Sequence, residues 1–257
     1  MTQSNNRIDL NCDLGESFGS YVLGLDEDIL GCVTSVNIAC GWHAGDPMVM
    51  DRTVGMAAER GVGIGAHPGF PDLMGFGRRN MAISPQEAKA YVTYQVGALA
   101  AFAAARGTKL QHVKAHGALY NMAAKDYQLA RAICEGVASV DPNLIVLGLA
   151  NSQWIRAGRD VGVDVRSEVF ADRAYQVDGT LVPRSQPGAV IQDADFAIRR
   201  AVQMVQEHKV ISITGQEVSL IPDSLCVHGD TPMALEFVRR LHDAFAQNGI
   251  ALRCMAE

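Results

Sequence analysis

Apolar and polar positions alternate over several short stretches of this chain, and most of these stretches precede a segment with helical periodicity. In residues 8–14 every second residue is apolar, and the residues between them are Asp9, Asn11 and Asp13. Because side chains alternate between the two faces of a strand, we expect a strand here with one buried face and one acidic face turned to water.

The same reasoning predicts seven strands in all, starting near residues 8, 35, 61, 110, 144, 163 and 224. Helices are predicted around and between them, over residues 26–30, 47–60, 85–106, 126–140, 153–161, 188–208 and 231–248. A hairpin is expected over residues 210–221, and a short closing strand over residues 251–255.

Local signals support two of the helix starts. Ser84-Pro85-Gln86-Glu87 has the form of a capping box with proline at the first helical position, and Asp46 before Pro47 is a candidate N-cap. The glycine-rich stretch 61–67 lacks a nucleotide-binding G-x-G-x-x-G because Ala66 stands at the last position. We interpret its glycines as allowing close packing within a strand.

Strands that alternate with helices are typical of a parallel sheet in an α/β protein. Doubly wound sheets usually have fewer strands, so seven or eight strands favour a closed (β/α) barrel. No Pro/Ser-rich linker or charge run interrupts the pattern, and residues 1–257 are therefore predicted to form a single barrel domain.

Composition excludes several classes of protein. The net charge of −6 argues against a nucleic-acid partner, and no run of about 18 apolar residues is present to cross a membrane. The start of the chain is polar and unlike a signal peptide, so a cytoplasmic protein with six reduced cysteines is expected.

Titratable residues gather where the predicted strands end. Four of the seven histidines lie there, at positions 43, 67, 116 and 228, and carboxylates accompany them at 13, 16, 46, 72, 168, 172 and 230. Each histidine taken alone is more simply a structural one. A barrel, however, directs all its strand ends into one cavity, where imidazoles and carboxylates supply general acids and bases.

Cationic side chains accompany these groups. Lys114 and His116 are two residues apart, so they share one face of a strand, and an ammonium there suits a carboxylate, a phosphate or an oxyanion. We expect Lys114 at the pocket mouth, with little core packing; a solvated rim lysine is the alternative. Arg78 and Arg79 could clamp an anion, or form an ordinary loop pair.

A divalent metal is a further option for the histidines and carboxylates. Their spacing does not match a compact zinc motif, so any ligands would come from separate strands, and we assign no metal ligand. The chain contains neither a G-x-x-x-x-G-K-[ST] phosphate loop nor a G-x-S-x-G elbow.

Taken together, the motifs resemble those of the LamB/YcsF family. The resemblance is collinear from Ile8 to the C-terminus and is carried by DLNCDLGE (9–16), NIACGWHAGD (37–46), GAHP (65–68), FGRR (76–79), VKAHGALYN (113–121), EVFADRAY (168–175), DGTLVPR (178–184) and HGD (228–230).

This resemblance implies a seven-stranded (β/α) barrel similar to those of glycoside hydrolases and polysaccharide deacetylases. It also implies one component of a bacterial ATP-dependent 5-oxoprolinase, which opens 5-oxo-L-proline to L-glutamate while hydrolysing ATP. ATP is then a cosubstrate, and two further subunits, B and C, are partners. The alternatives are a metal-dependent deacetylase or amidohydrolase acting alone, and a metabolite-sensing subunit.

Within that reaction we assign roles to the strand-end residues. The base is Asp13 or Glu16 with His43, and the acid is His116 or His67. Lys114 stabilises the oxyanion or phosphate, and Arg78 or Arg79 holds the substrate carboxylate. The remaining candidates for substrate binding are Asn11, Glu168, Arg173, Asp178 and His228.

Overall fold

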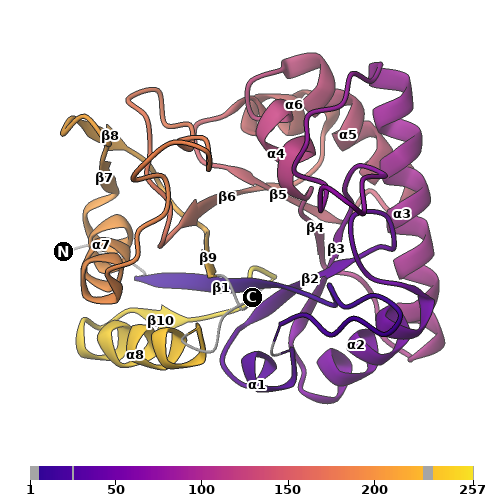
Figure 1. Ribbon diagram of the computed structural model, residues 1–257, viewed down its shortest axis with the longest axis horizontal. Coiled ribbons are helices and arrows are strands. Elements are labelled where there is room, and N and C mark those ends of the chain that lie inside the picture. The colour runs from indigo at the N-terminus through magenta and orange to yellow at the C-terminus, as the bar shows by residue number, and fades with distance from the viewer. Residues whose placement is uncertain (1–5, 25, 228–233, 257) are drawn as a thin grey trace.

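Seven parallel strands close into a barrel in the computed structural model, which describes residues 6–24, 26–227 and 234–256. Each strand pairs with the next, and the last returns to pair with the first, so the predicted seven-stranded (β/α) barrel is confirmed (Figure 1). In order around the barrel, the strands are β1 (Arg7–Leu14), β2 (Ser35–Ala39), β3 (Gly63–His67), β4 (His112–Val113), β5 (Ile145–Leu149), β6 (Val165–Phe170) and β9 (Ser224–Val227).

Two smaller strand pairings lie outside this closed ring. The predicted hairpin is present as β7 (Lys209–Ile211) and β8 (Glu217–Ser219), which pair antiparallel. The predicted closing strand is β10 (Ala251–Leu252), which pairs in parallel with the start of β1.

The helices are α1 (Asp26–Leu30), α2 (Pro47–Glu59), α3 (Pro85–Ala105), α4 (Gly117–Ala123), α5 (Tyr127–Val140), α6 (Gln153–Val161), α7 (Ala194–Glu207) and α8 (Ala234–Gln247). Ser84 and Glu87 form the predicted capping box of α3, and Asp46 caps α2 by accepting from the backbone N–H groups of Met48 and Val49. None of the helices over the described ranges is long and apolar enough to cross a membrane.

Two helices differ from prediction. Helix α7 starts at Ala194 and not near residue 188, because Gly188 has a φ of +78°, outside the helical range, and Asp193 supplies the N-cap. Helix α4 was not predicted. It is only seven residues long, and its N-cap His116 makes no capping hydrogen bond, so no local signal announces it.

Residues 110–116 were predicted as one strand, but only His112 and Val113 are paired as β4. The chain stays close to β3 beyond that point. The backbone N–H of Lys114 donates to Ala66 O at 2.9 Å, and that of His116 donates to Pro68 O at 2.8 Å. The end of this segment is therefore held over the barrel opening.

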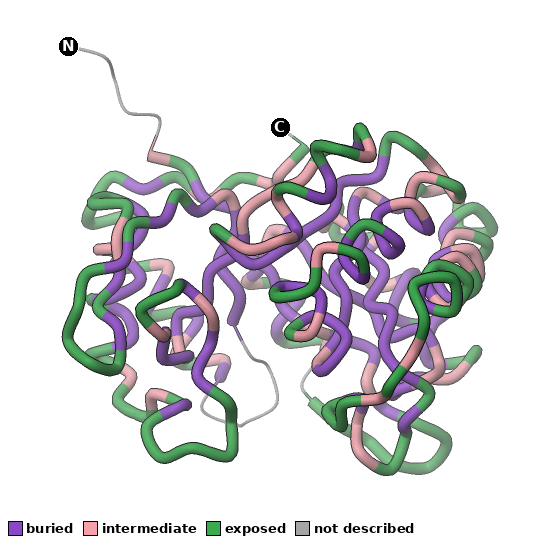
Figure 2. The backbone as a smooth tube through the Cα atoms, turned by 90° about the horizontal axis from the view of Figure 1, so that it is seen from above, coloured by how far each residue is buried: buried purple, intermediate pink, exposed green. Residues whose placement is uncertain are grey.

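Apolar side chains fill the layer between the barrel and its surrounding helices. Figure 2 shows that the buried segments of the chain lie inside and the exposed segments outside. The prediction that the acidic face of β1 is wet was wrong for its first two members. Asp9 and Asn11 are buried inside the barrel, because closure of the sheet by β9 covers that face. The hydroxyls of Thr34, Ser35 and Ser224 donate to the Asp9 carboxylate.

Gly65 of β3 allows close packing inside the barrel, as expected for the glycines of this strand. A Cβ added there would lie 2.1 Å from His112 Nε2. Only glycine therefore leaves room for the His112 ring inside the barrel, where Nε2 lies 2.8 Å from Asn37 Oδ1.

Candidate active site

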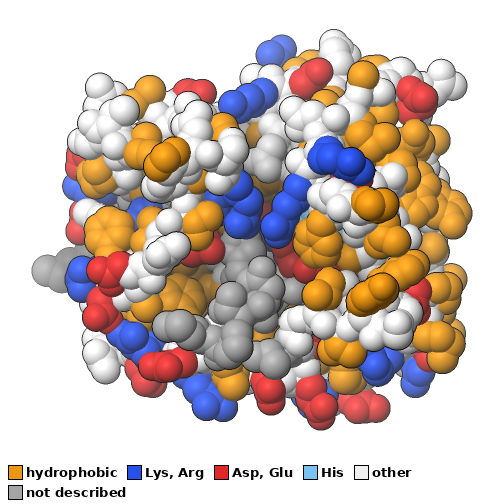
Figure 3. Space-filling model, viewed as in Figure 1, with side chains coloured by type: hydrophobic (Ala, Val, Ile, Leu, Met, Phe, Trp, Pro, Cys, Tyr) orange, Lys and Arg blue, Asp and Glu red, His pale blue; other side chains and the backbone are white. Residues whose placement is uncertain are grey.

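A cavity of about 540 Å³ opens at the C-terminal ends of the barrel strands. Asp13, His67, Lys114 and His116 lie in its wall, so strands β1 and β3 and the segment after β4 all contribute to it. Figure 3 shows Lys and Arg side chains gathered around the hollow on this face of the molecule. Such a volume is in the usual range for small-molecule sites.

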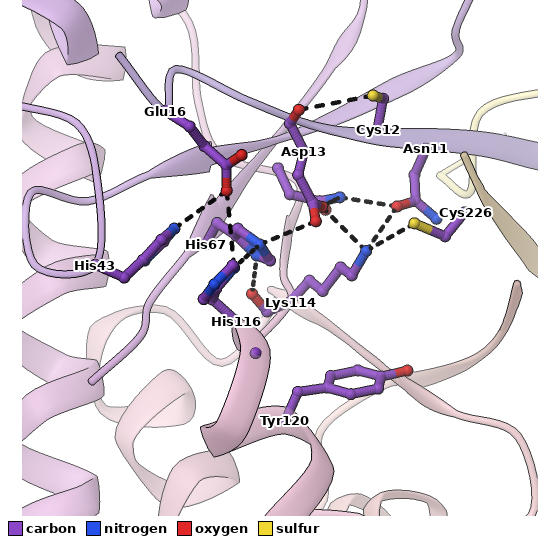
Figure 4. Close-up of polar contacts among 12 residues, drawn as sticks. Asn11, Cys12, Asp13, Glu16, His43, His67, Lys114, His116, Tyr120 and Cys226 are labelled. Atoms are coloured by element: carbon purple, nitrogen blue, oxygen red, sulfur yellow. Dashed lines mark hydrogen bonds and ion pairs between the residues drawn. The ribbon is translucent and has the colours of Figure 1, made fainter. Parts of the chain in front are cut away.

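Lys114 is the cation at the bottom of this site. Its Nζ lies 2.8 Å from Glu168 Oε1. It also lies 3.0 Å from Asp13 Oδ1 and donates to Asn11 Oδ1 at 3.2 Å (Figure 4). Only 3% of the side chain is exposed, so both the expected position at the pocket mouth and the alternative of a solvated rim lysine were wrong. Lys114 directly follows β4, and its side chain points into the barrel toward Asp13 and Glu168.

Opposing effects act on the charge of Lys114. Burial by itself lowers the pKa of the ammonium, but Asp13, Cys226 and Glu168 outweigh this effect and hold the pKa well above its ordinary value. Lys114 is therefore a fixed positive charge at the floor of the cavity.

Three residues of this polar network were not predicted as site residues. Tyr120 donates from its hydroxyl to Glu168 Oε2 at 2.6 Å, and Asn37 Nδ2 donates to Asp13 Oδ1 at 2.9 Å. His112 faces the same interior. The alternation of His112, Lys114 and His116 along one segment was a usable signal for His112, whereas Tyr120 lies on the unpredicted helix α4.

Four of the predicted residues, Glu16, His43, His67 and His116, lie together as a cluster beside Lys114 (Figure 4). Each offers one ligand atom, and these atoms all lie within 4.8 Å of one another. The His43 and His116 rings stack with centroids 3.7 Å apart and an interplanar angle of 3°. We call these four residues the histidine cluster, which is the group in the described part of the chain best able to hold a metal ion.

Burial controls the charge state of two of these rings. It lowers the pKa of His43 well below the ordinary value, and the neighbouring His67 acts in the same direction. Burial, then His43 and His67, lower the pKa of His116 in the same way. Both rings are therefore neutral at physiological pH.

The loop after β3 encloses the cluster and requires glycine at two places. A Cβ at Gly69 would lie 2.7 Å from His43 Nδ1, and a Cβ at Gly77 would lie 2.7 Å from His43 Cβ. Gly77 also has a φ of +61°, which favours glycine. This close approach leaves no room for a side chain between the loop and His43.

The arginines occupy different places. Arg78, Arg173 and Arg184 lie in the cavity wall, and burial together with Arg184 lowers the pKa of Arg173 to about 10. Arg79 instead forms an ion pair with Asp72 and does not line the cavity.

The remaining predicted substrate-binding residues differ in placement. Glu168 and Asn11 belong to the buried network around Lys114. Asp178 accepts a hydrogen bond from the Thr180 hydroxyl at 2.6 Å and lies in a neighbouring hollow with Asn151. His228 lies outside the residues that the structure describes.

Comparison with known families and proteins agrees with the sequence motifs. The model of the LamB/YcsF family matches residues 8–257 of this chain. The chain belongs to the LamB/YcsF family.

Proteins similar to this LamB/YcsF member include two that are named as the A subunit of 5-oxoprolinase. The one from Clostridium beijerinckii is 57% identical over 96% of this chain and 96% of its own length. The one from Bacillus subtilis is 57% identical over 98% of both chains.

Two solved structures also resemble it. The lactam utilization protein from Thermus thermophilus superposes with a TM-score of 0.90 at 46% identity, covering 96% of this chain and 99% of that one. A putative cellobiose-phosphate cleavage protein from Enterococcus faecalis superposes with a TM-score of 0.59 at 15% identity, covering 98% of each chain. The second likeness is one of fold alone.

Proposed function

We propose that this chain is the A subunit of an ATP-dependent 5-oxoprolinase, which opens 5-oxo-L-proline to L-glutamate in the cytoplasm. ATP is the cosubstrate, and two further subunits, B and C, complete the enzyme. The observation that carries the proposal is the 57% identity, over 96% of both chains, to the Clostridium beijerinckii protein named as the A subunit of 5-oxoprolinase.

The charge of the cavity suits this substrate. 5-Oxo-L-proline carries one carboxylate, and Arg78, Arg173 and Arg184 supply guanidinium groups in the cavity wall. Guanidinium groups bind carboxylates through paired N–H donors. Between Arg78 and Arg79 we assign the carboxylate to Arg78, since Arg78 lies in the cavity wall and Arg79 does not.

Opening of the lactam requires catalytic groups at its carbonyl oxygen, at the attacking water and at its ring nitrogen. Its carbonyl oxygen, phosphorylated by ATP or bearing negative charge after water adds, is stabilised by a fixed cation, which we assign to Lys114. The attacking water loses a proton to a base, and the ring nitrogen must gain a proton as the C–N bond breaks.

For the base we propose Asp13, or Glu16 with His43, and for the acid His67 or His116. Asp13 Oδ2 lies 3.3 Å from His67 Nε2, and Asp13 Oδ1 lies 3.0 Å from Lys114 Nζ, so this carboxylate touches both the cation and an imidazole. A proton taken from water by Asp13 is therefore within one hydrogen bond of the histidine cluster.

Release of glutamate from 5-oxo-L-proline tests the proposal. The purified chain is assayed with ATP alone and after assembly with subunits B and C. We expect ATP-dependent glutamate only from the assembled enzyme, because this chain carries no phosphate loop. Full turnover by the chain alone would contradict the need for partners, and ATP-independent hydrolysis of an N-acetyl substrate would favour a deacetylase.

A further inference from the structure

Two backbone carbonyls fix the tautomers of His67 and His116. His67 Nδ1 lies 2.7 Å from Lys114 O, and His116 Nε2 lies 2.8 Å from Phe76 O. A carbonyl oxygen can only accept a hydrogen bond, so each of these ring nitrogens carries a proton and donates it. In a neutral ring, the other nitrogen then has a lone pair and no proton.

Those two remaining nitrogens face each other. His67 Nε2 and His116 Nδ1 are 2.9 Å apart, so two lone pairs meet at hydrogen-bond distance. Carboxylate oxygens lie beside them: Asp13 Oδ2 is 3.3 Å from His67 Nε2, and Glu16 Oε1 is 3.8 Å from His116 Nδ1. Acceptors facing acceptors in a buried place require a cation between them.

From this geometry we propose that the histidine cluster is a divalent metal site, with zinc as the ion that its donors favour and with His67 Nε2 and His116 Nδ1 as the two fixed ligands. Glu16 supplies the carboxylate ligand, and His43 Nε2, 3.4 Å from Glu16 Oε1, is the fourth donor. Three imidazoles and one carboxylate are a donor set that suits zinc and not magnesium.

The surroundings of the two fixed rings match those of metal ligands. A histidine that binds a metal typically donates its other N–H to a carbonyl or a carboxylate, which sets the ring orientation. His67 and His116 both do so, through Lys114 O and Phe76 O. The alternative cation is a proton shared by the two rings, and titration of the chelator-treated chain with zinc distinguishes the two.

The site borders the cavity, because Asp13, His67 and His116 lie in the cavity wall. A metal ion here can act as a Lewis acid on a carbonyl oxygen or on water, with Asp13 as the neighbouring base. This catalytic role rests on the proposed function, whereas binding of the ion does not. A ring nitrogen bound to a metal cannot also donate a proton, so with the ion bound Asp13 would pass the proton that it takes from water to the ring nitrogen of the lactam.

Metal binding by the full chain tests the inference directly. The chelator-treated protein is titrated with Zn²⁺, Mn²⁺ and Mg²⁺ separately by calorimetry, and bound metal is counted by elemental analysis after dialysis. We expect one Zn²⁺ per chain, a higher melting temperature with Zn²⁺, and weaker binding of Mg²⁺. Absence of stoichiometric zinc from the wild-type chain would overturn the proposal.

The variants His67→Gln and His116→Gln locate the ion. Each is expected to weaken zinc binding by at least about 100-fold, because loss of a group that only hydrogen-bonds to a metal ligand already costs roughly 10–100-fold. Each should also lose the zinc-dependent rise in melting temperature. Retention of wild-type affinity by both variants would overturn the assignment. If a variant fails to fold, Glu16→Gln serves instead, with at least a tenfold loss expected.

A matched control is His208→Asn. His208 is exposed, ends α7 with a φ of 54°, and lies outside the cluster, and asparagine tolerates that conformation. This variant should bind zinc as the wild type does; loss of zinc here would contradict the proposed site. Glutamate release by the assembled enzyme is measured separately in excess Mg²⁺, so failure of the metal site and failure of the proposed function are distinguishable.

Discussion

Lys114 Nζ and Glu168 Oε1 lie 2.8 Å apart inside the barrel, and the two side chains are 3% and 0% exposed. Asp13 lies on the other side of the same ammonium. Charged groups this deeply buried are stable only when paired, and the pair therefore links catalysis to folding. The expectation from the sequence that Lys114 has little core packing therefore needs revision.

Removal of Lys114 tests both roles. In Lys114→Ala we expect turnover of the assembled enzyme to fall by about 10²–10³, as when an oxyanion donor is lost. The free energy of unfolding should fall by about 3–5 kcal/mol, because Glu168 is left buried without its cation. Steady-state kinetics and urea unfolding measure the two effects. Lys114→Arg should also turn over poorly, because a planar fork replaces a compact charge.

A double variant separates the two effects of Lys114. In the double variant Lys114→Met/Glu168→Gln, both charges of the buried pair are removed. We therefore expect it to be more stable than Lys114→Ala, while its turnover stays low. Wild-type turnover in this variant would contradict the oxyanion role.

Arg78 and Arg79 are adjacent but should differ in function. Arg78→Ala is expected to raise the KM for 5-oxo-L-proline by roughly tenfold or more, the usual loss for a charged hydrogen bond. Arg79→Ala serves as the matched control, and its KM should stay within about twofold, because Arg79 is paired with Asp72. Initial rates over a range of substrate concentrations give the KM of each variant. An equal rise in KM in Arg78→Ala and Arg79→Ala would argue against Arg78 as the carboxylate ligand.

Asp9 predicts a pH dependence of stability. Burial raises the pKa of this carboxyl from 3.8 to about 6, although Ser224, Thr34 and Ser35 donate hydrogen bonds to it. The folded chain therefore holds the proton more tightly than the unfolded chain. This contribution to stability is complete below pH 3.8 and is lost as the pH rises through about 6.

Asp9→Asn isolates that effect. Relative to wild type, the variant should gain about 2 kcal/mol in unfolding free energy between pH 4 and pH 7, because asparagine carries no charge to bury. Urea unfolding of both proteins across this range measures the difference, in which other titrating groups cancel. A difference that does not change with pH would show that Asp9 is already ionised at pH 4.

Tyr120 offers a smaller test of the network. Tyr120→Phe removes the 2.6 Å hydrogen bond from the hydroxyl to Glu168 Oε2 and keeps the ring. The expected loss is about 1.5–3 kcal/mol in unfolding free energy, the usual value for a hydrogen bond to a charged group. Tyr127→Phe is the control, since its hydroxyl donates to the exposed Asp160. Equal losses in the two variants would contradict a special role for the buried bond.

The sequence by itself determined the elements and their order. The alternation in β1, the capping box at Ser84 and the cap at Asp46 are local features, which a strand or helix end needs whatever lies around it. Because the strands are parallel, their order also placed His43, His67 and His116 at one end of the barrel. Helix α4 and the true start of α7 were not predicted, because the local sequence signals for them are weak or misleading.

The tertiary structure alone decided what surrounds each side chain. Closure of β9 onto β1 buried Asp9 and Asn11, which the alternation had placed in water. The carbonyls of Lys114 and Phe76 fixed the tautomers of the two facing imidazoles, His67 and His116. Arg79 forms an ion pair with Asp72 and does not line the cavity. These outcomes depend on distances between residues far apart in the chain, and strand register and barrel closure, not local sequence, set those distances.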